Sequence, residues 1–382
     1  MKHAVQFVSR MLHCSFVILA LSAILRFQPS AFAQGPLGPP GPPGPTMITL
    51  SQIEPRTPIS ALPATITISG SYYVTTNLTC TTCTSGTNGI TILVNDVTVD
   101  LSGFTLQGVA GAGSGITVSG PERNLAIRNG VMDSWGNNGV LAVNGYDSQF
   151  ERLRESNSGA TGLATGSNCL LLVCSVNVNG TDGILAGNNS TVKDCVAAGN
   201  TGSEFSNGIL VGSNCTVIGC TATGNRFDGI NVGINCTVKD CTAGGNTGAG
   251  INLGNNCTVK DCTSSGNGGG MNVGNNCSVK DCTISGNSND GIFVSGNNCQ
   301  IVGNTCSTNG EFGIEIVGVQ NRIDGNSVGH NTSYGIITDS LNVNNCVTRN
   351  SSPGLGYGSY TGNNDYAPTG SVSTATNPWT NF

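Results

Sequence analysis

Hydrophobic and polar residues alternate along most of this chain with a period of two, in runs too short for helices. The segment GINLGNNCTVKDCTSSGNGG, residues 250–269, shows the pattern well. Its inward-facing positions form three pairs with one polar residue between the members: Ile251 and Leu253, Cys257 and Val259, Cys262 and Ser264. Strict alternation indicates short strands with one buried face, and the intervening Gly, Asn and Asp are typical of tight turns. The segment therefore predicts three strands and three corners.

The same segment recurs through the chain. Each unit opens with a Gly followed by Ile, Val, Leu or Met: Gly115, Gly139, Gly162, Gly183, Gly208, Gly229, Gly250, Gly270, Gly291, Gly313 and Gly335. From Gly208 to Gly291 the spacings are 21, 21, 20 and 21 residues. A repeat of this length indicates a solenoid, and no segment has helical periodicity. We therefore predict an all-β fold of roughly twelve stacked three-sided coils.

The units resemble those of the right-handed parallel β-helix proteins of the pectin-lyase-like superfamily, in particular the secreted bacterial members built from GI-x-V, NN-x-x-I-x-x-N and GN repeats. The likeness covers about Gly89 to Asn350, and GSYYVTTNLT and VTVDLSGFTLQG are similar to the start of that family's helix. The resemblance implies a right-handed, single-stranded parallel β-helix. It implies no single activity, because this architecture is found in lyases, hydrolases, epimerases, adhesins and proteins with no known catalytic activity.

The two ends of the chain differ from the repeats. Residues 1–33 match an export signal with an apolar stretch too short to span a bilayer, which predicts a secreted protein, periplasmic or extracellular, without a membrane span. Residues 34–46 are a collagen-like Gly-Pro segment, expected to be a stiff spacer of a monomer or a trimerising element. We assign 47–88 to an N-terminal cap and 89–350 to the β-helix. The tail 351–382 is expected to lie along the last coils through Trp379 and Phe382.

Asparagine recurs at two fixed places in the units. One set directly precedes Cys or the residue aligned with it: Asn168, Asn189, Asn214, Asn235, Asn256, Asn276 and Asn298. The other set closes the unit: Asn200, Asn225, Asn246, Asn267 and Asn287. Stacked amides hydrogen-bond from coil to coil and fix the register. We therefore predict two asparagine ladders.

Cysteine forms two further columns. Their members are Cys215, Cys236, Cys257, Cys277 and Cys299 in one, and Cys174, Cys195, Cys220, Cys241, Cys262 and Cys282 in the other. In-register parallel strands point neighbouring Cβ atoms the same way, which is poor disulfide geometry. We therefore predict that most are buried thiols acting as small apolar side chains. Cys80 and Cys83 lie outside both columns and are the candidate pair for a local disulfide.

Lysine and aspartate also recur as a pair at one corner of the repeat. The pairs are Lys193-Asp194, Lys239-Asp240, Lys260-Asp261 and Lys280-Asp281. Each Asp has a neighbouring Lys that cancels its charge, which favours a solvated corner. Stacked carboxylates binding Ca²⁺ or a cationic sugar are the alternative. We therefore predict no metal site and no cofactor, with Ca²⁺ as the alternative.

The composition narrows the classes of function. Of 382 residues only 9% are charged and 5% aromatic, and the net charge is −6, so the chain lacks the basic surface that nucleic acid requires. A catalytic group must differ from its stacked neighbours, and the least regular coils run from Gly115 to Thr161. The candidate catalytic residues there are Asp133, Asp147, Arg152 and Arg154, and the candidate ligand-binding residues are Trp135 and Tyr146. Aromatic rings beside Arg and carboxylates suit a sugar; alternatively, the charged residues only solvate the outside.

Three functions are compatible with these observations. The first is a secreted, non-enzymatic β-solenoid with a surface, matrix or glycan-binding role, because near-identical coils offer no singular reacting group. The second is a carbohydrate-active enzyme, a polysaccharide lyase or a glycoside hydrolase, with its site in residues 115–161; the resemblance implies the acidic and basic groups that such sites use. The third is a trimeric adhesin or fibre joined through residues 35–46. A polysaccharide is the expected partner.

Overall fold

The computed structural model describes residues 54–84, 86–338, 344–351 and 358–359. The predicted export signal, the Gly-Pro segment and most of the predicted tail, with Trp379 and Phe382, lie outside the described residues. The chain from Arg56 onward forms one compact unit, and all its described regular elements are β-strands. None of the described residues forms a helix that is long and apolar enough to cross a membrane.

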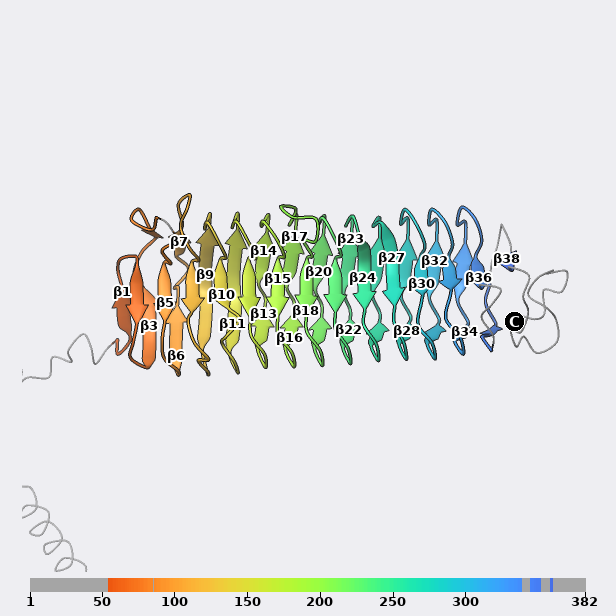
Figure 1. Cartoon of the computed structure of the whole chain (residues 1–382), viewed down its shortest axis with the longest axis horizontal. Coiled ribbons are helices and arrows are strands. Elements are labelled where there is room, and N and C mark those ends of the chain that lie inside the picture. The colour runs from red at the N-terminus through yellow and green to blue at the C-terminus, as the bar shows by residue number, and fades with distance from the viewer. Residues whose placement is uncertain (1–53, 85, 339–343, 352–357, 360–382) are drawn as a thin grey trace, which may run out of the picture. The chain divides into compact units, whose positions relative to one another are not determined.

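The chain winds into three-sided coils that stack along one axis (Figure 1). The first face is a parallel sheet of 14 strands. These are β2 (Ala64–Ile66), β5 (Ile90–Ile92), β8 (Ile116–Val118), β10 (Val140–Ala142), β12 (Leu163–Thr165), β15 (Ile184–Ala186), β18 (Ile209–Val211), β21 (Ile230–Val232), β24 (Ala249–Leu253), β27 (Gly269–Val273), β30 (Ile292–Val294), β33 (Ile314–Ile316), β36 (Ile336–Thr338) and β38 (Gly358–Ser359).

The second and third faces join into one sheet of 24 strands, because two eight-residue strands, β9 (Ala126–Asp133) and β11 (Gln149–Ser156), run through both. The second face also holds β1 (Thr57–Ile59), β3 (Gly70–Val74), β6 (Val97–Asp100), β13 (Leu170–Leu172), β16 (Thr191–Lys193), β19 (Thr216–Ile218), β22 (Thr237–Lys239), β25 (Thr258–Lys260), β28 (Ser278–Lys280), β31 (Gln300–Val302), β34 (Arg322–Asp324) and β37 (Cys346–Thr348). The third holds β4 (Leu78–Thr79), β7 (Thr105–Gln107), β14 (Ser175–Asn177), β17 (Val196–Ala198), β20 (Thr221–Thr223), β23 (Thr242–Gly244), β26 (Thr263–Ser265), β29 (Thr283–Ser285), β32 (Thr305–Ser307) and β35 (Ser327–Gly329).

Equivalent residues lie directly above one another in this stack. Ile251 pairs with Met271 on the first face, and Val259 pairs with Val279 on the second. All four side chains are buried, so the predicted period-two alternation and the predicted β-solenoid are confirmed. Successive coils are separated by the spacing of neighbouring strands, so the 14 strands of the first face span about 60 Å.

The coils begin earlier than we predicted. β1 pairs in parallel with β3, β2 with β5, and β4 with β7. Much of the segment 47–88, expected to be a separate cap, therefore forms the first coils of the same stack. At the other end, Gly358 and Ser359 of the predicted tail pair with Ile337 and Thr338 and add a strand to the first face.

Both predicted asparagine ladders are present, and they differ in environment. The ladder at the first corner, between the first and second faces, is exposed; Asn189 Nδ2 donates to Asn168 Oδ1 at 3.1 Å and Asn235 Nδ2 to Asn214 Oδ1 at 3.0 Å. Its members have φ between 56° and 60°, the left-handed conformation that Asn tolerates better than most residues. The ladder at the third corner, between the third and first faces, is buried and extends beyond the predicted set to Asn179 and Asn331.

The two predicted cysteine columns fill the interior of the first and second corners, and all their members are buried free thiols, as predicted. In later coils an inward asparagine takes the position of the sulfur. Cys220 N donates to Cys241 Sγ at 3.4 Å, whereas further along the same column Cys282 N donates to Asn304 Oδ1 at 3.0 Å. A thiol at this position therefore does more than fill space, because it accepts a backbone N–H that would otherwise be buried without a partner.

Candidate functional site

The six sequence-predicted site residues do not converge on one site. Asp133 and Asp147 are held near opposite ends of the paired strands β9 and β11, in which Ser156 pairs with Asp133 and Gln149 with Ala126. Arg152 forms an ion pair with Glu151 at 3.0 Å and has φ of 51° at the second corner. Arg154 is exposed on the part of β11 that belongs to the third face.

Asp147 and Tyr146 belong to a surface cluster at the first corner. The Asp147 carboxylate accepts from Arg123 Nη1 at 2.7 Å and from Asn168 Nδ2 at 2.8 Å, and the Arg123 guanidinium lies 5.5 Å from the centre of the Tyr146 ring. The hydrogen bond from Asn168 and the charge of Arg123 lower the pKa of Asp147. Asp147 thus starts the exposed asparagine ladder, and its donors favour a permanently ionised carboxylate that is unsuited to proton transfer near neutral pH.

Asp133 is held in the same manner on the third face. It accepts hydrogen bonds from Ser156 Oγ at 3.0 Å and Asn157 Nδ2 at 2.8 Å. Burial raises its pKa, but these and further side-chain hydrogen bonds outweigh burial, so the pKa is lowered overall. Its two close donors are residues of the next coil, which indicates a role in joining coils.

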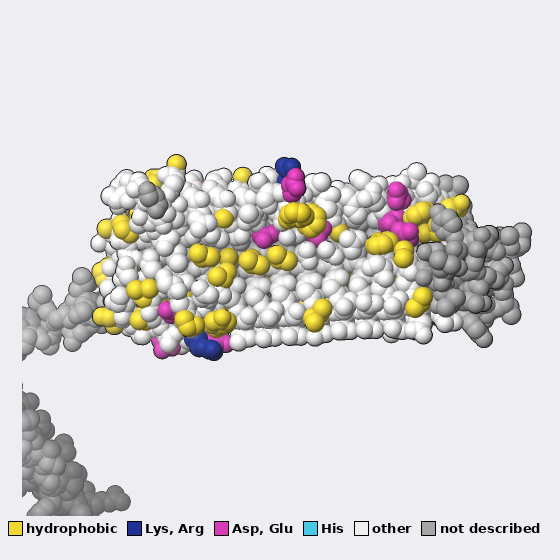
Figure 2. Space-filling view, viewed as in Figure 1, with side chains coloured by type: hydrophobic (Ala, Val, Ile, Leu, Met, Phe, Trp, Pro, Cys, Tyr) yellow, Lys and Arg dark blue, Asp and Glu magenta, His cyan; other side chains and the backbone are white. Residues whose placement is uncertain are grey.

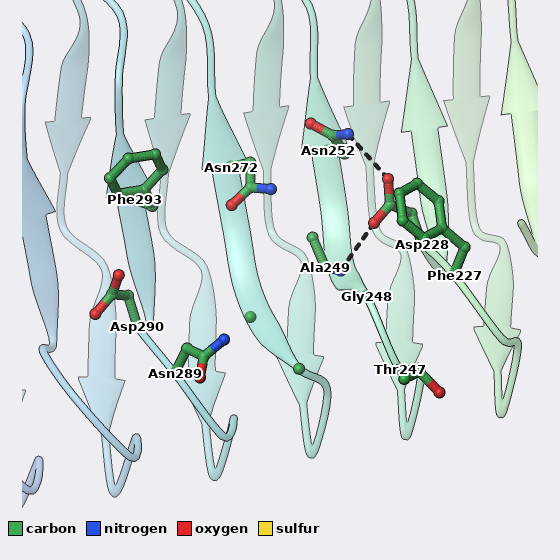
Figure 3. A pocket seen from close by; sticks show the side chains of 12 residues that line it. Phe227, Asp228, Thr247, Gly248, Ala249, Asn252, Asn272, Asn289, Asp290 and Phe293 are labelled. Carbon is green, nitrogen blue, oxygen red and sulfur yellow. Dashed lines mark hydrogen bonds between the residues drawn. The ribbon is translucent and has the colours of Figure 1, made fainter. Parts of the chain in front are cut away.

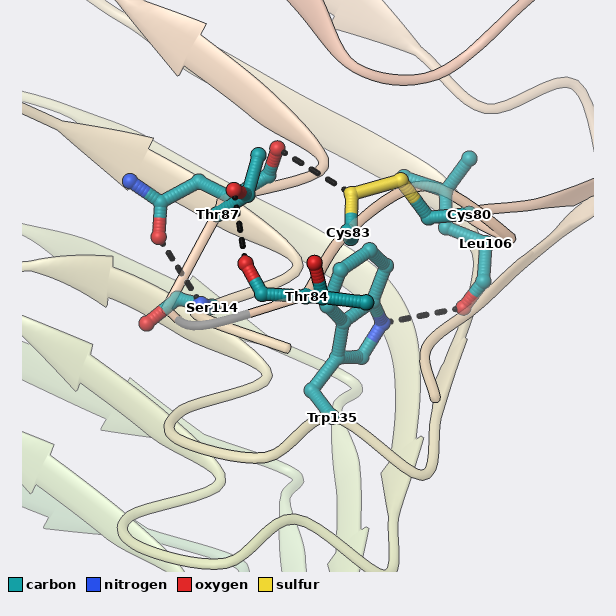
Figure 4. Close-up of a disulfide and its surroundings, with 8 residues drawn as sticks. Cys80, Cys83, Thr84, Thr87, Leu106, Ser114 and Trp135 are labelled. Atoms are coloured by element: carbon teal, nitrogen blue, oxygen red, sulfur yellow. Dashed lines mark hydrogen bonds between the residues drawn. A yellow bond between two sulfur atoms is a disulfide. The ribbon is translucent and has the colours of Figure 1, made fainter. Parts of the chain in front are cut away.

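The expectation that Trp135 offers its ring to a sugar is wrong. Its side chain is 1% exposed, and its indole Nε1 donates to the carbonyl oxygen of Leu106 at 3.0 Å. Figure 4 shows the ring close to the loop in which a disulfide joins Cys80 and Cys83, the pair singled out from the sequence. The ring fills the interior beside three glycines that leave no room for a Cβ: Gly89, Gly108 and Gly115.

Sequence spacing contained a signal for this burial. Trp135 lies four residues before Gly139, which opens the next unit, and Ser158 and Asn179 lie four residues before the glycines that open theirs. The backbone pairing shows the same alignment. Gly159 N donates to Trp135 O, and Gly180 N donates to Ser158 O. Trp135 therefore occupies the inward column that the buried asparagine ladder takes further along.

Glu155 is a buried carboxyl that the sequence did not distinguish from its exposed neighbours. It points into the core, 1% exposed, and accepts from Ser158 Oγ at 2.5 Å and Asn179 Nδ2 at 2.7 Å. Burial raises its pKa to about 7, against these two hydrogen bonds. Because solvent and ligands do not reach it, Glu155 acts within the fold, where it ends the buried ladder.

The lysine and aspartate pairs form the solvated second corner that we predicted. Lys239 Nζ lies 3.0 Å from Asp240 Oδ2, and Lys260 Nζ lies 3.5 Å from Asp261 Oδ2 and 3.9 Å from Asp281 Oδ2. Within the described ranges, no three His, Cys, Asp or Glu side chains group where they could hold a metal ion.

A groove that the sequence reasoning missed lies on the first face and the third corner. The residue just before the Gly of each unit forms a vertical column here: Asp182, Asn207, Asp228, Ala249, Gly269, Asp290, Phe312 and Tyr334. Two successive members, Ala249 and Gly269, have almost no side chain. Their strands, β24 and β27, are five residues long where the adjacent β21 and β30 have three. The missing side chains leave a groove of about 390 Å³.

Polar and aromatic side chains line this groove (Figure 3). Asn252 and Asn272 project from the middle of β24 and β27, Phe227 and Asp228 stand on one side, and Phe293 stands on the other with Asp290. Amide, carboxylate and aromatic groups in one groove match what a sugar uses, since sugars combine hydroxyl groups with apolar ring faces.

Asp228 holds the shape of one end of the groove. Its carboxylate accepts from Ala249 N at 2.8 Å, Asn252 Nδ2 at 2.9 Å and Asn231 Nδ2 at 3.2 Å. Burial raises its pKa and the hydrogen bonds from Asn252 and Ala249 oppose the rise. With both its oxygens accepting hydrogen bonds inside the protein, Asp228 orients the Asn252 amide so that the amide oxygen remains available to a ligand.

Asp290 stands three coils away at the other end and is less fully bonded. Its Oδ1 accepts from Phe312 N at 3.1 Å. Its Oδ2 accepts no hydrogen bond from the described residues, although the residue is only 9% exposed. The Oδ2 atom itself is not enclosed by the protein, so it is accessible from the groove, and a carboxylate oxygen is a strong acceptor for a ligand.

Two of the few aromatic residues in this part of the chain, Phe227 and Phe293, line the groove. Between residues 157 and 351 the chain has five, namely Phe205, Phe227, Phe293, Phe312 and Tyr334. Phe205 packs edge-on against Phe227 with ring centres 5.4 Å apart, and Phe312 stacks on Tyr334 at 6.2 Å. The face seen in Figure 2 is otherwise mostly free of hydrophobic and charged side chains, which appear there in a few patches.

The groove's carboxylates are too far apart to act together on one bond. Asp228 and Asp290 are separated by three coil steps, about 14 Å, whereas the paired carboxyl groups of glycosidases lie within about 9.5 Å of each other. The arrangement suits binding along the coil axis.

Comparison with known proteins agrees with the fold. A family model described as the right handed beta helix region matches residues 152–280 and 233–373, together more than half of the chain. The chain belongs to the right-handed β-helix family. No curated protein matches this β-helix at the level of sequence.

Solved structures resemble this β-helix in fold. The A-module of mannuronan C-5 epimerase AlgE6 from Azotobacter vinelandii has a TM-score of 0.58 at 18% identity, over 78% of this chain and 89% of that one. A variant of the periplasmic alginate epimerase AlgG has a TM-score of 0.51 at 13% identity, over 68% and 74%. The pre-mature gene product 12 of bacteriophage phi29 has a TM-score of 0.50 at 12% identity, over 75% and 48%. At these identities the likeness extends to the fold alone.

Proposed function

We propose that this β-helix is a secreted, non-enzymatic carbohydrate-binding protein and that its binding site is the groove over Ala249 and Gly269. The observation that carries the proposal concerns the column formed by the residue just before the Gly of each unit. At Ala249 and Gly269 this column lacks large side chains. Where Asp, Asn, Phe or Tyr side chains stand in most coils of this region, two successive coils leave space, and the space is bordered by Phe227 and Phe293.

Its shape and composition support sugar binding over other ligands. The first face supplies two amides, Asn252 and Asn272, along the coil axis, and an extended chain laid on that axis would meet equivalent groups one coil apart. Aromatic side chains at both ends offer apolar surface to sugar rings. Among the solved structures of similar fold, one is named a mannuronan C-5 epimerase and another an alginate epimerase.

Two features favour binding without turnover. The groove's carboxylates are about 14 Å apart by coil spacing, and no His, Lys or Arg lines the groove within the described residues. Of the candidate catalytic residues of the 115–161 coils, Asp133, Asp147 and Arg152 lie apart and are bonded to neighbouring side chains. The fourth, Arg154, is exposed on the third face. An acid and a base that meet at one bond, which hydrolysis and β-elimination require, are therefore missing from the groove.

The proposal is tested by a panel of neutral, cationic and anionic oligosaccharides with two readouts on the same samples. Binding is followed by calorimetry, and turnover is followed by reducing ends and by the ultraviolet absorbance of unsaturated lyase products. We expect at least one oligosaccharide to bind and none to be cleaved. Cleavage of any member would make the protein an enzyme, and the absence of binding across the panel would remove the carbohydrate-binding function.

A further inference from the structure

We propose that the groove selects oligosaccharides with free amino groups, and that the Asp290 carboxylate receives the ammonium group of the sugar. This inference rests on the proposed function and specifies its ligand. It sets the groove apart from sites for uronates, whose carboxylates would face the negative charge of the protein.

The unpaired oxygen of Asp290 is the first argument. Asp290 lines the groove with nine-tenths of its surface buried, and Oδ2 accepts no hydrogen bond from the described residues (Figure 3). This oxygen is accessible from the groove, where a donor group of a ligand can replace the water that solvates it. An ammonium group supplies three donors and a positive charge, and so it satisfies this oxygen better than a hydroxyl does.

The charge around the groove is the second argument. Acidic residues stand along the third corner and the first face: Asp182, Glu204, Asp228, Asp290, Glu311 and Glu315. The cation of the third corner in these coils, Arg226, is exposed and does not line the groove. The Lys side chains of the described repeats are at the second corner, on another edge of the coil. The net negative potential attracts amines and repels carboxylates.

The amide and aromatic groups complete the recognition of a sugar carrying an amine. Asn252 is oriented by Asp228 through a 2.9 Å hydrogen bond, so its oxygen is the free end of the amide. This oxygen and the Asp290 carboxylate are acceptors, which suit the hydroxyl and ammonium donors of such a sugar. Phe293 lies in strand β30, three residues after Asp290, and lines the same groove, where cation–π attraction to its ring adds to the binding of an ammonium group.

The test compares three oligosaccharides of matched length by calorimetry at neutral pH: β-1,4-linked glucosamine, its N-acetylated form and galacturonate. We expect the free-amine oligomer to bind at least about tenfold more tightly than the N-acetylated one. We also expect its affinity to fall with added salt and the galacturonate oligomer not to bind. The variant Asp290→Asn keeps the shape and the bond from Phe312 N, and should weaken only the free-amine oligomer, by about tenfold.

Asp182→Asn is the matched control. Asp182 belongs to the same column and accepts from Asn207 N at 2.8 Å and Asn207 Nδ2 at 2.9 Å, but it does not line the groove. It should leave all affinities unchanged. Equal binding of the amine and N-acetyl oligomers, unaffected by Asp290→Asn, would overturn the amine selectivity while the carbohydrate-binding function stands. Preferential binding of galacturonate would do the same. If the parent protein bound none of the oligosaccharides, the proposed carbohydrate-binding function itself would be removed.

Discussion

The side-chain amide of Asn246 donates to Asn267 Oδ1 in the next coil at 2.9 Å, and the same oxygen accepts the backbone N–H of Asn246 at 2.9 Å. One buried oxygen thus joins two coils through two hydrogen bonds. The arrangement repeats along the third corner, with Asn225 bonded in the same way to Asn246. Polar side chains can fill the inside of this corner because each one forms hydrogen bonds with the next, so their polar groups are not left without partners.

Removing one rung of the buried ladder should be costly. In Asn246→Ala the backbone N–H and the side-chain amide of Asn225 lose their acceptor, so we expect the free energy of unfolding to fall by about 2 to 4 kcal/mol. In the exposed ladder, Asn235→Gly can still adopt the φ of 60°. Water replaces the lost hydrogen bonds of its neighbours, so the free energy of unfolding should fall by less than about 1 kcal/mol. Urea denaturation compares the two. Equal losses would contradict a ladder whose strength comes from burial.

The cysteines should behave as acceptors as well as apolar side chains. Cys241 Sγ accepts Cys220 N at 3.4 Å, and Asn304 fills the equivalent place further along the column. Cys241→Val leaves the Cys220 N–H buried without a partner, whereas Cys241→Asn supplies an acceptor. We therefore expect the free energy of unfolding of the asparagine variant to be higher by about 1 to 3 kcal/mol. Thermal denaturation under reducing conditions measures the difference. Greater stability of the valine variant would show that only volume and hydrophobicity matter at this position.

Glu155 should make the protein less stable as the pH rises through the weakly acidic range. Its pKa is raised to about 7 in the folded state from an ordinary value of 4.5, so the folded protein binds the proton more tightly than the unfolded chain does. The proton's contribution to stability is full below pH 4.5, declines between the two values and is lost above 7. Glu155→Gln should remove this slope and raise stability at pH 8 by about 3 kcal/mol. Unfolding curves from pH 4 to 8 that slope equally for both proteins would contradict the assignment.

Trp135 should matter for stability and not for ligand binding. Trp135→Ala removes a ring that is 1% exposed and bonded to Leu106 O, so we expect a loss of about 3 to 5 kcal/mol. Tyr146→Ala, at the half-buried ring beside Arg123, should cost less than about 1 kcal/mol. Neither change should alter oligosaccharide affinity at a temperature where both variants remain folded. A selective loss of affinity in Trp135→Ala, with its circular dichroism spectrum unchanged, would restore the sequence-based expectation.

The stack could be predicted from the sequence because each coil repeats the same pattern. The spacing of the glycines and the alternation around Ile251 and Val259 determine both the fold and the inward side chains, and the asparagine positions identify the ladders. Trp135 was misplaced because its charged sequence neighbours suggested a surface. Its inward direction depends on the pairing of its coil with the next one, through Gly159 N and Trp135 O.

The groove escaped prediction for a different reason. The groove forms because Ala249 and Gly269 have almost no side chain in a column of larger residues. Their small size can be recognised only when the stacking of the coils is known. The five aromatic residues between positions 157 and 351 were visible in the sequence: Phe205, Phe227, Phe293, Phe312 and Tyr334. Without the coil register, however, these residues are scattered over more than a hundred positions.

Filling the groove is the most direct test of its role. A Cβ at Gly269 meets no atom within 4 Å, and Phe312 occupies the equivalent place two coils later, so Gly269→Phe should fold normally. Thr263→Phe, in the same coil but on the third face, is the control. By calorimetry with the tightest-binding oligosaccharide, we predict that Gly269→Phe loses binding by at least about a hundredfold while the control binds as the parent does. Unchanged affinity in a folded Gly269→Phe variant would contradict the account.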